Sequence, residues 1–289
     1  MSVTPQSVIL AGIDGSNFSD AVIDYAIWLS KIHQSPLKLL HTIEHSHHSE
    51  QVHHEGNLTP NMKEHLLDEL SDEERQESKQ LIADGKRLIT NAKQRAEQAG
   101  VENVIAKQRH GTLPEALSDL ESEISMVVLG AKGEDHQGSK AGLGTQLEQA
   151  IRAISKPVFI ATTSFSEPQK LLFAYNGSPT SQKALNLLKK NAFFDSQLEI
   201  HIVSVQKSLA DATNLVEDAR TELQAAGLNI VAKAMTGDPV KELTQYQQEK
   251  AIDITMMGAF SHGKLHGFIF GSFTTQMLLE STTQFLLIR

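Results

Sequence analysis

Apolar runs of strand length alternate with helix-like patterns along the whole chain. The first strand is expected at residues 8–13 and the second at 37–43, and between them apolar side chains recur with the 3.6-residue period of a helix. Further strands are expected at 103–107, 125–129 and 157–161, and further helices at 114–120 and 146–154, with a long helix that ends at about Ala99. Because strand, helix and strand in succession favour parallel pairing with right-handed crossovers, the pattern predicts an α/β fold.

The same order of elements then repeats after a linker that we expect at residues 164–169. Residues 171–178 echo residues 9–16, and residues 229–233 echo residues 103–107. Asp14 lies 162 positions before its counterpart Asn176, whereas Asn103 lies 126 positions before Asn229, so the first copy is longer by 36 residues. Landmarks that recur in one order indicate a duplicated α/β domain, and we expect domains at 1–163 and 170–289.

The additional residues of the first copy form a polar segment at about 44–70. Six histidines lie in it: His45, His47, His48, His53, His54 and His65. Imidazoles suit zinc or nickel, but their spacing matches no fixed metal-site geometry, so we predict a polar surface excursion and no metal site. Asn61 and Ser71 are each placed to cap a short helix, and Gly100 is placed to end the long helix that follows.

The composition of the chain limits which kinds of partner and which cellular compartment we expect. The chain has 289 residues, a formal charge of −9 and no cysteine. An acidic chain without a basic stripe is a poor match for nucleic acid, and the missing cysteine excludes disulfides and thiolate catalysis. No apolar run approaches the roughly 20 residues that span a bilayer, and the N-terminus lacks the pattern of a signal peptide. We therefore expect a cytoplasmic protein without nucleic-acid or membrane partners.

A glycine-containing loop follows the fourth strand of each copy. In the first copy Gly130 and Gly133 interrupt the strand, and Gly144 and Thr145 open the next helix. The corresponding residues of the second copy are Gly258, Ser261, Gly271 and Ser272. Glycines allow the backbone to approach an anion closely, and the free N–H groups of a first helical turn point toward it. Strand, loop and helix N-terminus in this order predict a phosphate site.

These motifs together resemble the universal stress protein family. Each copy opens with a strand that ends in Asp14-Gly-Ser or Asn176-Gly-Ser, and the second carries a Gly-Asp-Pro turn at Gly237. Both end in a late glycine motif, and the nucleotide-binding members of the family show G-x2-G-x9-G-[ST]. The whole chain resembles the tandem, bacterial E-type class of that family, in which one chain holds two such domains.

The resemblance implies a fold and a class of function. It implies two tandem open five-stranded parallel sheets with helices on both faces, Rossmann-like and similar to the adenine nucleotide alpha hydrolases. It also implies that the two domains pair within the chain through their last strands, here residues 157–161 and 285–289. A stress-response regulator without catalytic residues is expected, and the expected ligand is ATP or a related adenine nucleotide.

The resemblance assigns ligand contacts to twelve residues. Adenine and ribose would lie near the carboxyl ends of the first two strands, and the phosphates would lie on the glycine loop. The implied adenine-side residues are Asp14 and Thr42 in the first copy and Asn176 and Ser204 in the second. The implied phosphate-side residues are Gly130, Gly133, Gly144, Thr145, Gly258, Ser261, Gly271 and Ser272.

Each copy departs from the motif in a different way. Ten residues rather than nine separate Gly133 from Gly144. In the second copy the spacing of nine is kept, but Ser261 replaces a glycine and Asn176 replaces the aspartate. Serine costs about 1 kcal/mol or more wherever the loop needs a positive φ. Spacing favours the second copy and Asp14 favours the first, so the sequence does not rank them.

Three functions stay open at this point. The chain is a nucleotide-binding sensor, a scaffold that contacts other proteins or a small apolar ligand, or a weak ATP hydrolase. The third has the least support, because no histidine, carboxylate or lysine stands out as a catalytic base. A homodimer and the identity of protein partners also stay open.

Overall fold

The computed structural model describes residues 7–43, 60–131, 145–190, 198–259 and 272–289, with the backbone alone for 60–75 and 145. The described residues form a mixed α/β fold. In the first half the elements are β1 Val8–Gly12, α1 Ser19–His33, β2 Leu37–Ile43, α2 Pro60–Gln98, β3 Val104–His110, α3 Leu113–Leu120, β4 Ile124–Gly130, α4 Thr145–Ala153 and β5 Val158–Ala161. In the second half they are β6 Lys170–Ala174, α5 Pro179–Lys189, β7 Glu199–Gln206, α6 Leu209–Ala225, β8 Ile230–Thr236, α7 Pro239–Lys250, β9 Ile254–Gly258, α8 Ser272–Glu280 and β10 Gln284–Ile288.

The ten strands form one continuous sheet in the order β3-β2-β1-β4-β5-β10-β9-β6-β7-β8. All neighbours within each half are parallel. At the seam β5 and β10 are antiparallel, with Ile160 opposite Phe285 and Val158 opposite Leu287. The predicted pairing through the last strands is therefore confirmed, and the two predicted sheets are halves of one sheet. Because the seam is antiparallel, the carboxyl ends of the two sets of strands lie at opposite edges.

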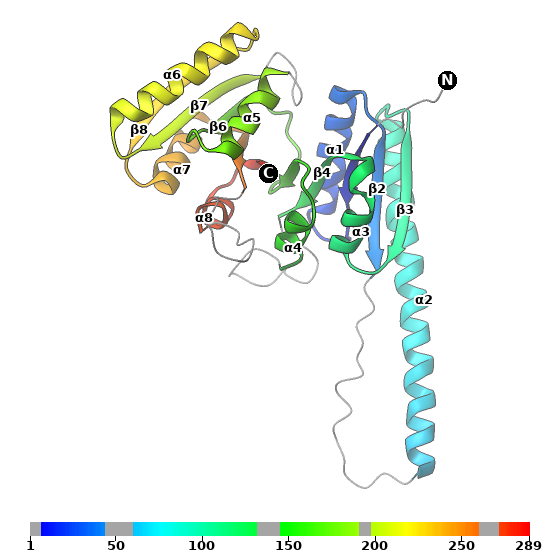
Figure 1. The fold of residues 1–289 in the computed structure, drawn as a ribbon. Helices are drawn as coiled ribbons and strands as arrows, with labels where there is room; N and C mark the ends of the chain where they lie inside the picture. Colours follow the sequence, from blue (N-terminus) through cyan, green and yellow to red (C-terminus); the bar gives the residue numbers. More distant parts are fainter. Residues whose placement is uncertain (1–6, 44–59, 132–144, 191–197, 260–271) are drawn as a thin grey trace.

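Helices cover both faces of the sheet, as predicted (Figure 1). The core on one face holds residues of α1, α2, α5 and α6, and the core on the other holds residues of α3, α4, α7 and α8. Alternate residues of one strand contribute to both: Ile9 and Ala11 belong to the first core, and Val8 and Leu10 to the second. Parallel strands that are buried on both faces read as continuous apolar runs, which is why the sequence identified them.

The long helix α2 corrects the prediction for the inserted segment. It runs unbroken for 39 residues from Pro60, so Ser71 lies inside it and the expected separate short helix is absent from residues 60–98. No glycine or proline lies between Pro60 and Gly85 in the sequence, and residues that favour helices fill this stretch. The predicted excursion extended to about residue 70; its part at 44–59 lies outside the described residues.

Helix α2 is longer than the sheet that it packs on. At 1.5 Å per residue it is about 58 Å long, whereas a seven-residue strand spans about 23 Å. Its N-terminal part therefore extends beyond the sheet, as Figure 1 shows. The helix ends at Gln98, and Gly100 closes its C-terminus as expected: this glycine has a φ of +89°, and the Val101 N–H donates to the Ala96 carbonyl at 3.1 Å.

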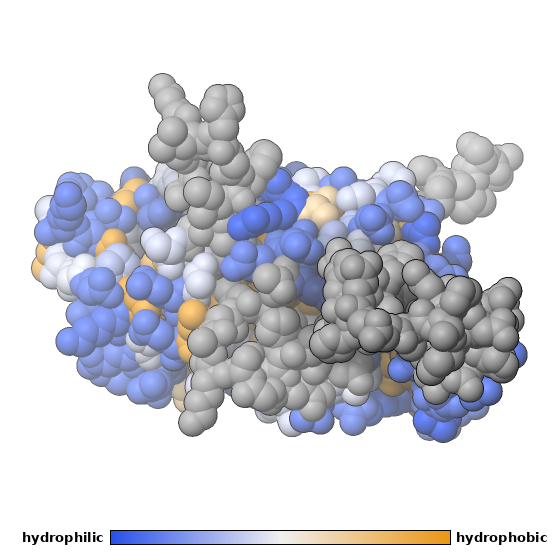
Figure 2. Space-filling model, turned by 90° about the horizontal axis from the view of Figure 1, so that it is seen from below, coloured by the Kyte–Doolittle hydropathy of each residue, from blue (hydrophilic) through white to orange (hydrophobic). Residues whose placement is uncertain are grey.

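The face of the molecule drawn in Figure 2 is predominantly hydrophilic. On the face drawn in Figure 2, outside the grey atoms, hydrophilic residues predominate and hydrophobic ones lie in small separate patches. Among the described residues no helix combines the length and the apolar character that crossing a membrane requires.

Candidate functional site

The loop after β1 is organised by the carboxylate of Asp14. One of its oxygens accepts hydrogen bonds from the Ser16 N–H at 3.0 Å and from the Ser19 hydroxyl at 3.1 Å. The Ser19 hydroxyl in turn accepts from the N–H of Gly15 at 3.0 Å, and Gly15 has a φ of +85°. These bonds fix the turn that leads from β1 into α1, so the Asp14 side chain is held at the carboxyl edge of the first half.

His41 supports the same loop from β2. Its Nδ1 lies 2.9 Å from the carbonyl oxygen of Ile13, and its ring packs against Gly85 of α2. A Cβ at Gly85 would lie 2.5 Å from the ring, so only glycine lets α2 approach this closely. From the sequence we predict that His41 is a packing residue, and the contacts of its ring with Ile13 and Gly85 agree with that role.

The described residues at the predicted site of the first half line a small cavity. Asp14, Thr42 and Gly130 line a space of about 60 Å³. Leu113 and Leu129 occupy the crevice beside it: their methyl groups lie 3.5 and 2.8 Å from where a Cβ on Gly12 would stand. Sites for cofactor-sized ligands usually measure about 300–1,000 Å³, so this cavity is too small for a purine. Thr145 begins α4, as predicted, whereas Gly133 and Gly144 lie outside the described residues.

The second half holds a much larger cavity at the corresponding place. Its volume is about 540 Å³, and Asn176 and Gly258 line it. Ser204 lies between two lining residues, Val203 and Val205, and its own buried hydroxyl accepts from the Gln206 side chain at 3.2 Å. Ser272 begins α8, while Ser261 and Gly271 lie outside the described residues. The structure thus brings Asn176 and Gly258 to one cavity, whereas Ser204 is not among the residues that line it.

Local capping fixes the polar rim of this cavity. The Asn176 side-chain oxygen accepts from the Ser178 N–H at 3.1 Å, and the Ser178 hydroxyl caps α5 by accepting from the Ser181 N–H at 3.3 Å. At the opposite side, the Thr274 hydroxyl donates to the Ala259 carbonyl at 3.1 Å and so holds α8 against the end of β9. The rim therefore consists of the N-terminal ends of two helices, whose N–H groups favour electron-rich ligand atoms.

Gly258 has a packing role at the mouth of the cavity. A Cβ on this residue would lie 3.0 Å from Cγ2 and 3.1 Å from Cβ of Thr180 in the first turn of α5. Glycine lets α5 lie against the end of β9, and the two elements then enclose one side of the cavity.

The two cavities carry different residues at one corresponding position. Leu113 and Pro239 both stand two residues after a glycine turn, at Gly111 and Gly237, and each lines the cavity of its half. The Leu113 side chain lies 3.5 Å from where a Cβ on Gly12 would stand, and the compact proline ring of Pro239 lines the larger cavity. The sequence contained this contrast, but its consequence depends on how α3 and α7 lie against their strands.

The described part of the second cavity carries no charged side chain. Its walls are mostly apolar, with Val203, Val205, Leu243 and Met257 facing it, and Phe273 lies at the start of α8. Burial raises the pKa of the lining Tyr175 above its ordinary value, with Glu222 adding to that effect, so the phenol stays neutral. Such a cavity suits a flat, uncharged group such as a nucleobase.

A metal centre finds no support in the described side chains. Among them no group of three or more His, Cys, Asp or Glu residues is arranged to hold an ion. Of the histidine-rich segment, His45, His47, His48, His53 and His54 lie outside the described residues, and only the backbone of His65 is described.

Comparison with known proteins identifies relatives over nearly the whole chain. The sequence profile of the universal stress protein family matches residues 7–162 and again residues 168–289. The universal stress protein Slr1230 of Synechocystis is 31% identical over 285 residues, which cover 97% of this chain and 99% of that protein. The universal stress protein YxiE of Bacillus subtilis is 30% identical over 128 residues, covering 43% of this chain and 78% of that protein.

Solved structures share the fold at lower sequence identity. A universal stress protein from Archaeoglobus fulgidus superposes with a TM-score of 0.70 and 19% identity over 99% of both chains. A putative universal stress protein from Pseudomonas aeruginosa gives a TM-score of 0.64 and 17% identity over 98% of this chain and 93% of that one. At these identities the structures support the arrangement of two α/β halves and nothing about ligands.

Proposed function

Because the chain belongs to the universal stress protein family, we propose that its second half binds an adenine nucleotide and that the chain acts as a cytoplasmic stress-response regulator. The observation that carries the proposal is the cavity of about 540 Å³ between Asn176 and Gly258. It lies where β6 has β7 on one side and β9 on the other. In open α/β sheets, ligands bind in such a crevice, at the carboxyl ends of the strands.

The described residues supply distinct contacts for the two ends of a nucleotide. The adenine would lie between the apolar side chains of Val205 and Leu243, and the Asn176 amide would pair with its polar edge. The phosphates would lie toward the first turn of α8, which begins at Ser272. The first half has the same edge but only about 60 Å³, so we propose one nucleotide per chain.

We propose binding without turnover. The described lining of the cavity holds no carboxylate, histidine or lysine that could act as a general base. A hydrolase would release phosphate from ATP faster than a buffer blank does, and a substitution that fills the cavity would abolish that release.

The test is calorimetric titration of ATP, together with mass identification of any nucleotide released when the purified protein is denatured. Val205→Trp places an indole in the cavity, and we expect ATP affinity to fall about tenfold or more. Val231→Trp is the matched control, because Val231 is 37% exposed on the edge strand β8 and ATP affinity should not change. Equal affinities of the two variants and the wild type would refute the assignment of the site.

A second candidate is an uncharged small ligand in the same cavity, and the uncharged described lining favours it. Comparing the affinities of adenosine and ATP distinguishes the two functions. If the first turn of α8 binds phosphate, ATP binds more tightly than adenosine; equal affinities would mean that the phosphates contribute nothing. Failure of both to bind, with a folded protein, would leave the scaffold function.

A further inference from the structure

A second large cleft lies between the two halves, away from the nucleotide cavity. Its volume is about 920 Å³, and it is lined by α1, the last turn of α2, the segment 165–169 and Leu198. None of its lining residues is shared with the cavity at Asn176. Ligand sites in proteins occur preferentially at such junctions between domains, and this volume lies within their usual range. We call it the seam cleft.

One wall of the seam cleft is aromatic. Tyr25 is buried, with its ring centroid 5.0 Å from that of Phe159 in the sheet. Around Tyr25, the ring of Phe165 lies edge-on at 4.9 Å and the ring of Trp28 edge-on at 6.4 Å. Trp28 is half-buried and Phe165 is 37% exposed, so both present ring surface to the cleft.

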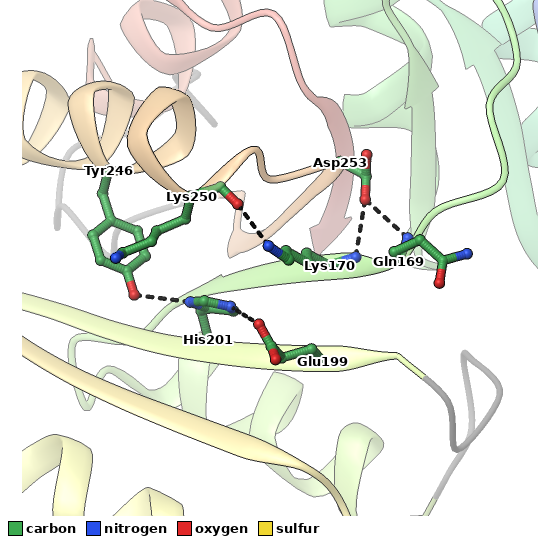
Figure 3. A network of polar contacts seen from close by, with 7 residues as sticks. All are labelled: Gln169, Lys170, Glu199, His201, Tyr246, Lys250 and Asp253. Carbon is green, nitrogen blue, oxygen red and sulfur yellow. Dashed lines mark hydrogen bonds and ion pairs between the residues drawn. The ribbon is translucent and has the colours of Figure 1, made fainter.

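The other wall is fixed to the second half. One carboxylate oxygen of Asp253 accepts from the backbone N–H groups of Gln169 at 2.8 Å and Lys170 at 2.9 Å, and the Lys170 ammonium donates to the Lys250 carbonyl at 3.1 Å (Figure 3). The Gln169 carbonyl accepts from the Glu199 N–H at 3.0 Å. The segment that leads into β6 is thus held in place, and both walls of the cleft are preformed.

The charges that line the seam cleft balance one another. Asp24 and Glu167 are acidic, and Lys31 and Arg95 are basic. Arg95 is already engaged, because its guanidinium donates to Asp24 at 2.6 Å and to Asp20 outside the lining at 2.8 Å. An ionic ligand would meet groups of both signs and would have to lose its own hydration, whereas an uncharged ligand avoids that cost.

We propose that the seam cleft binds an uncharged, flat aromatic molecule, whose rings lie against Trp28 and Phe165. Apolar residues on the same lining, Ile27 and Pro168 among them, would cover the remainder of such a ligand. The site spans both halves of the chain, and it does not depend on the nucleotide proposal, since the two cavities share no residue.

The test uses N-phenyl-1-naphthylamine, an uncharged aromatic probe, with the intact chain. Trp28 is the single tryptophan of the protein, so energy transfer from it to the probe reports binding near the seam cleft. We expect saturation at one probe per chain. Phe165→Ala removes a ring from the wall and should weaken binding about tenfold, and Ala99→Phe, which places a ring in the cleft, should weaken it as well.

Controls make the result decisive. Leu279→Ala removes an apolar side chain that is 50% exposed on α8 and should leave probe affinity unchanged, and saturating ATP should not displace the probe. Circular dichroism checks that each variant is folded. Probe affinity that is unchanged in both Phe165→Ala and Ala99→Phe, or displacement by ATP, would overturn the proposal. An anionic naphthalenesulfonate that binds more than tenfold tighter than the neutral probe would overturn the assigned ligand class.

Discussion

At the scale of single residues, glycines set how closely elements approach each other near both candidate pockets. Gly85 admits α2 to the ring of His41, and Gly258 admits α5 to the end of β9. Neither residue has the positive φ that usually explains a required glycine. Glycine is needed at these two positions because a Cβ would collide with a neighbouring side chain. The glycine motif in the sequence did identify Gly258, but it assigned this residue to phosphate binding and not to packing.

We predict that Gly258→Ala destabilises the protein by about 1–3 kcal/mol, because its methyl group would press on Thr180. Urea denaturation of the variant measures this change in the free energy of unfolding. Thr180→Ala provides the matched partner, since it removes the methyl group that the new Cβ would meet. The double variant should lose less stability than the sum of the single variants; additive losses would contradict the proposed contact.

At the scale of elements, caps and turns connect helices to the strands that follow them. The Glu121 carboxylate accepts from the N–H of Ser155 at 2.7 Å and from its hydroxyl at 2.6 Å, at the junction between α4 and β5. These hydrogen bonds, the hydroxyl first, hold the pKa of Glu121 below its ordinary value, and Lys156 and Arg289 add to the effect. The contact ties the end of α3 to the seam strand β5.

We predict that Ser155→Ala raises the pKa of Glu121 toward the ordinary glutamate value of about 4.3. A carboxyl whose folded-state pKa is lowered contributes stability that is present above the unfolded pKa and is lost as pH falls through the folded pKa. The site is partly exposed, so the contribution should be a few tenths of a kcal/mol. NMR titration of the Glu121 side chain measures the shift, and an unchanged pKa would show that the Ser155 hydroxyl is not its cause.

At the scale of the whole molecule, the two halves share one sheet, joined at β5 and β10. The three backbone pairs between β5 and β10 are extended by the buried side chain of Gln284, which accepts from the Thr162 N–H at 2.7 Å and donates to the Thr163 hydroxyl at 2.6 Å. This side chain and the Thr162 hydroxyl, which donates to the Thr283 carbonyl at 2.9 Å, continue the seam into the segment after β5.

We predict that Gln284→Ala costs about 1–3 kcal/mol, since it leaves the Thr162 N–H without its partner. Trp28 fluorescence reports the first half and circular dichroism reports both halves. We expect the two signals to coincide during urea unfolding of the wild-type protein, and Gln284→Ala to lower the midpoint of both. Gln245→Ala on the exposed side of α7 is the control. Separate transitions in the wild type would show that the seam does not couple the halves.

Much of this fold could be predicted from the sequence. Strands buried on both faces leave continuous apolar runs, helices leave a 3.6-residue period, and a duplication leaves landmarks in the same order, so these features are local or repeated. The end of α2 just before Gly100 followed from a local signal in the same way. The pairing of residues 157–161 with 285–289 was instead implied by the resemblance to the universal stress protein family. The start of α2 was not predicted correctly. Asn61 and Ser71 are typical helix-capping residues, but both lie inside α2 because the surrounding residues strongly favour a helix.

Only the tertiary structure shows how much space the described residues leave at the two candidate sites. In the sequence, Asp14 favours a nucleotide site in the first half and the spacing of the glycine loop favours one in the second half, so the sequence alone does not rank the two halves. In the first half Leu113 and Leu129 lie beside Gly12 and the cavity measures about 60 Å³, whereas the cavity lined by Pro239 in the second half measures about 540 Å³. The seam cleft likewise joins Trp28 to Leu198 across 170 positions of sequence. A cavity is the space left between side chains that are distant in the chain, and no local pattern records how much space remains after they pack.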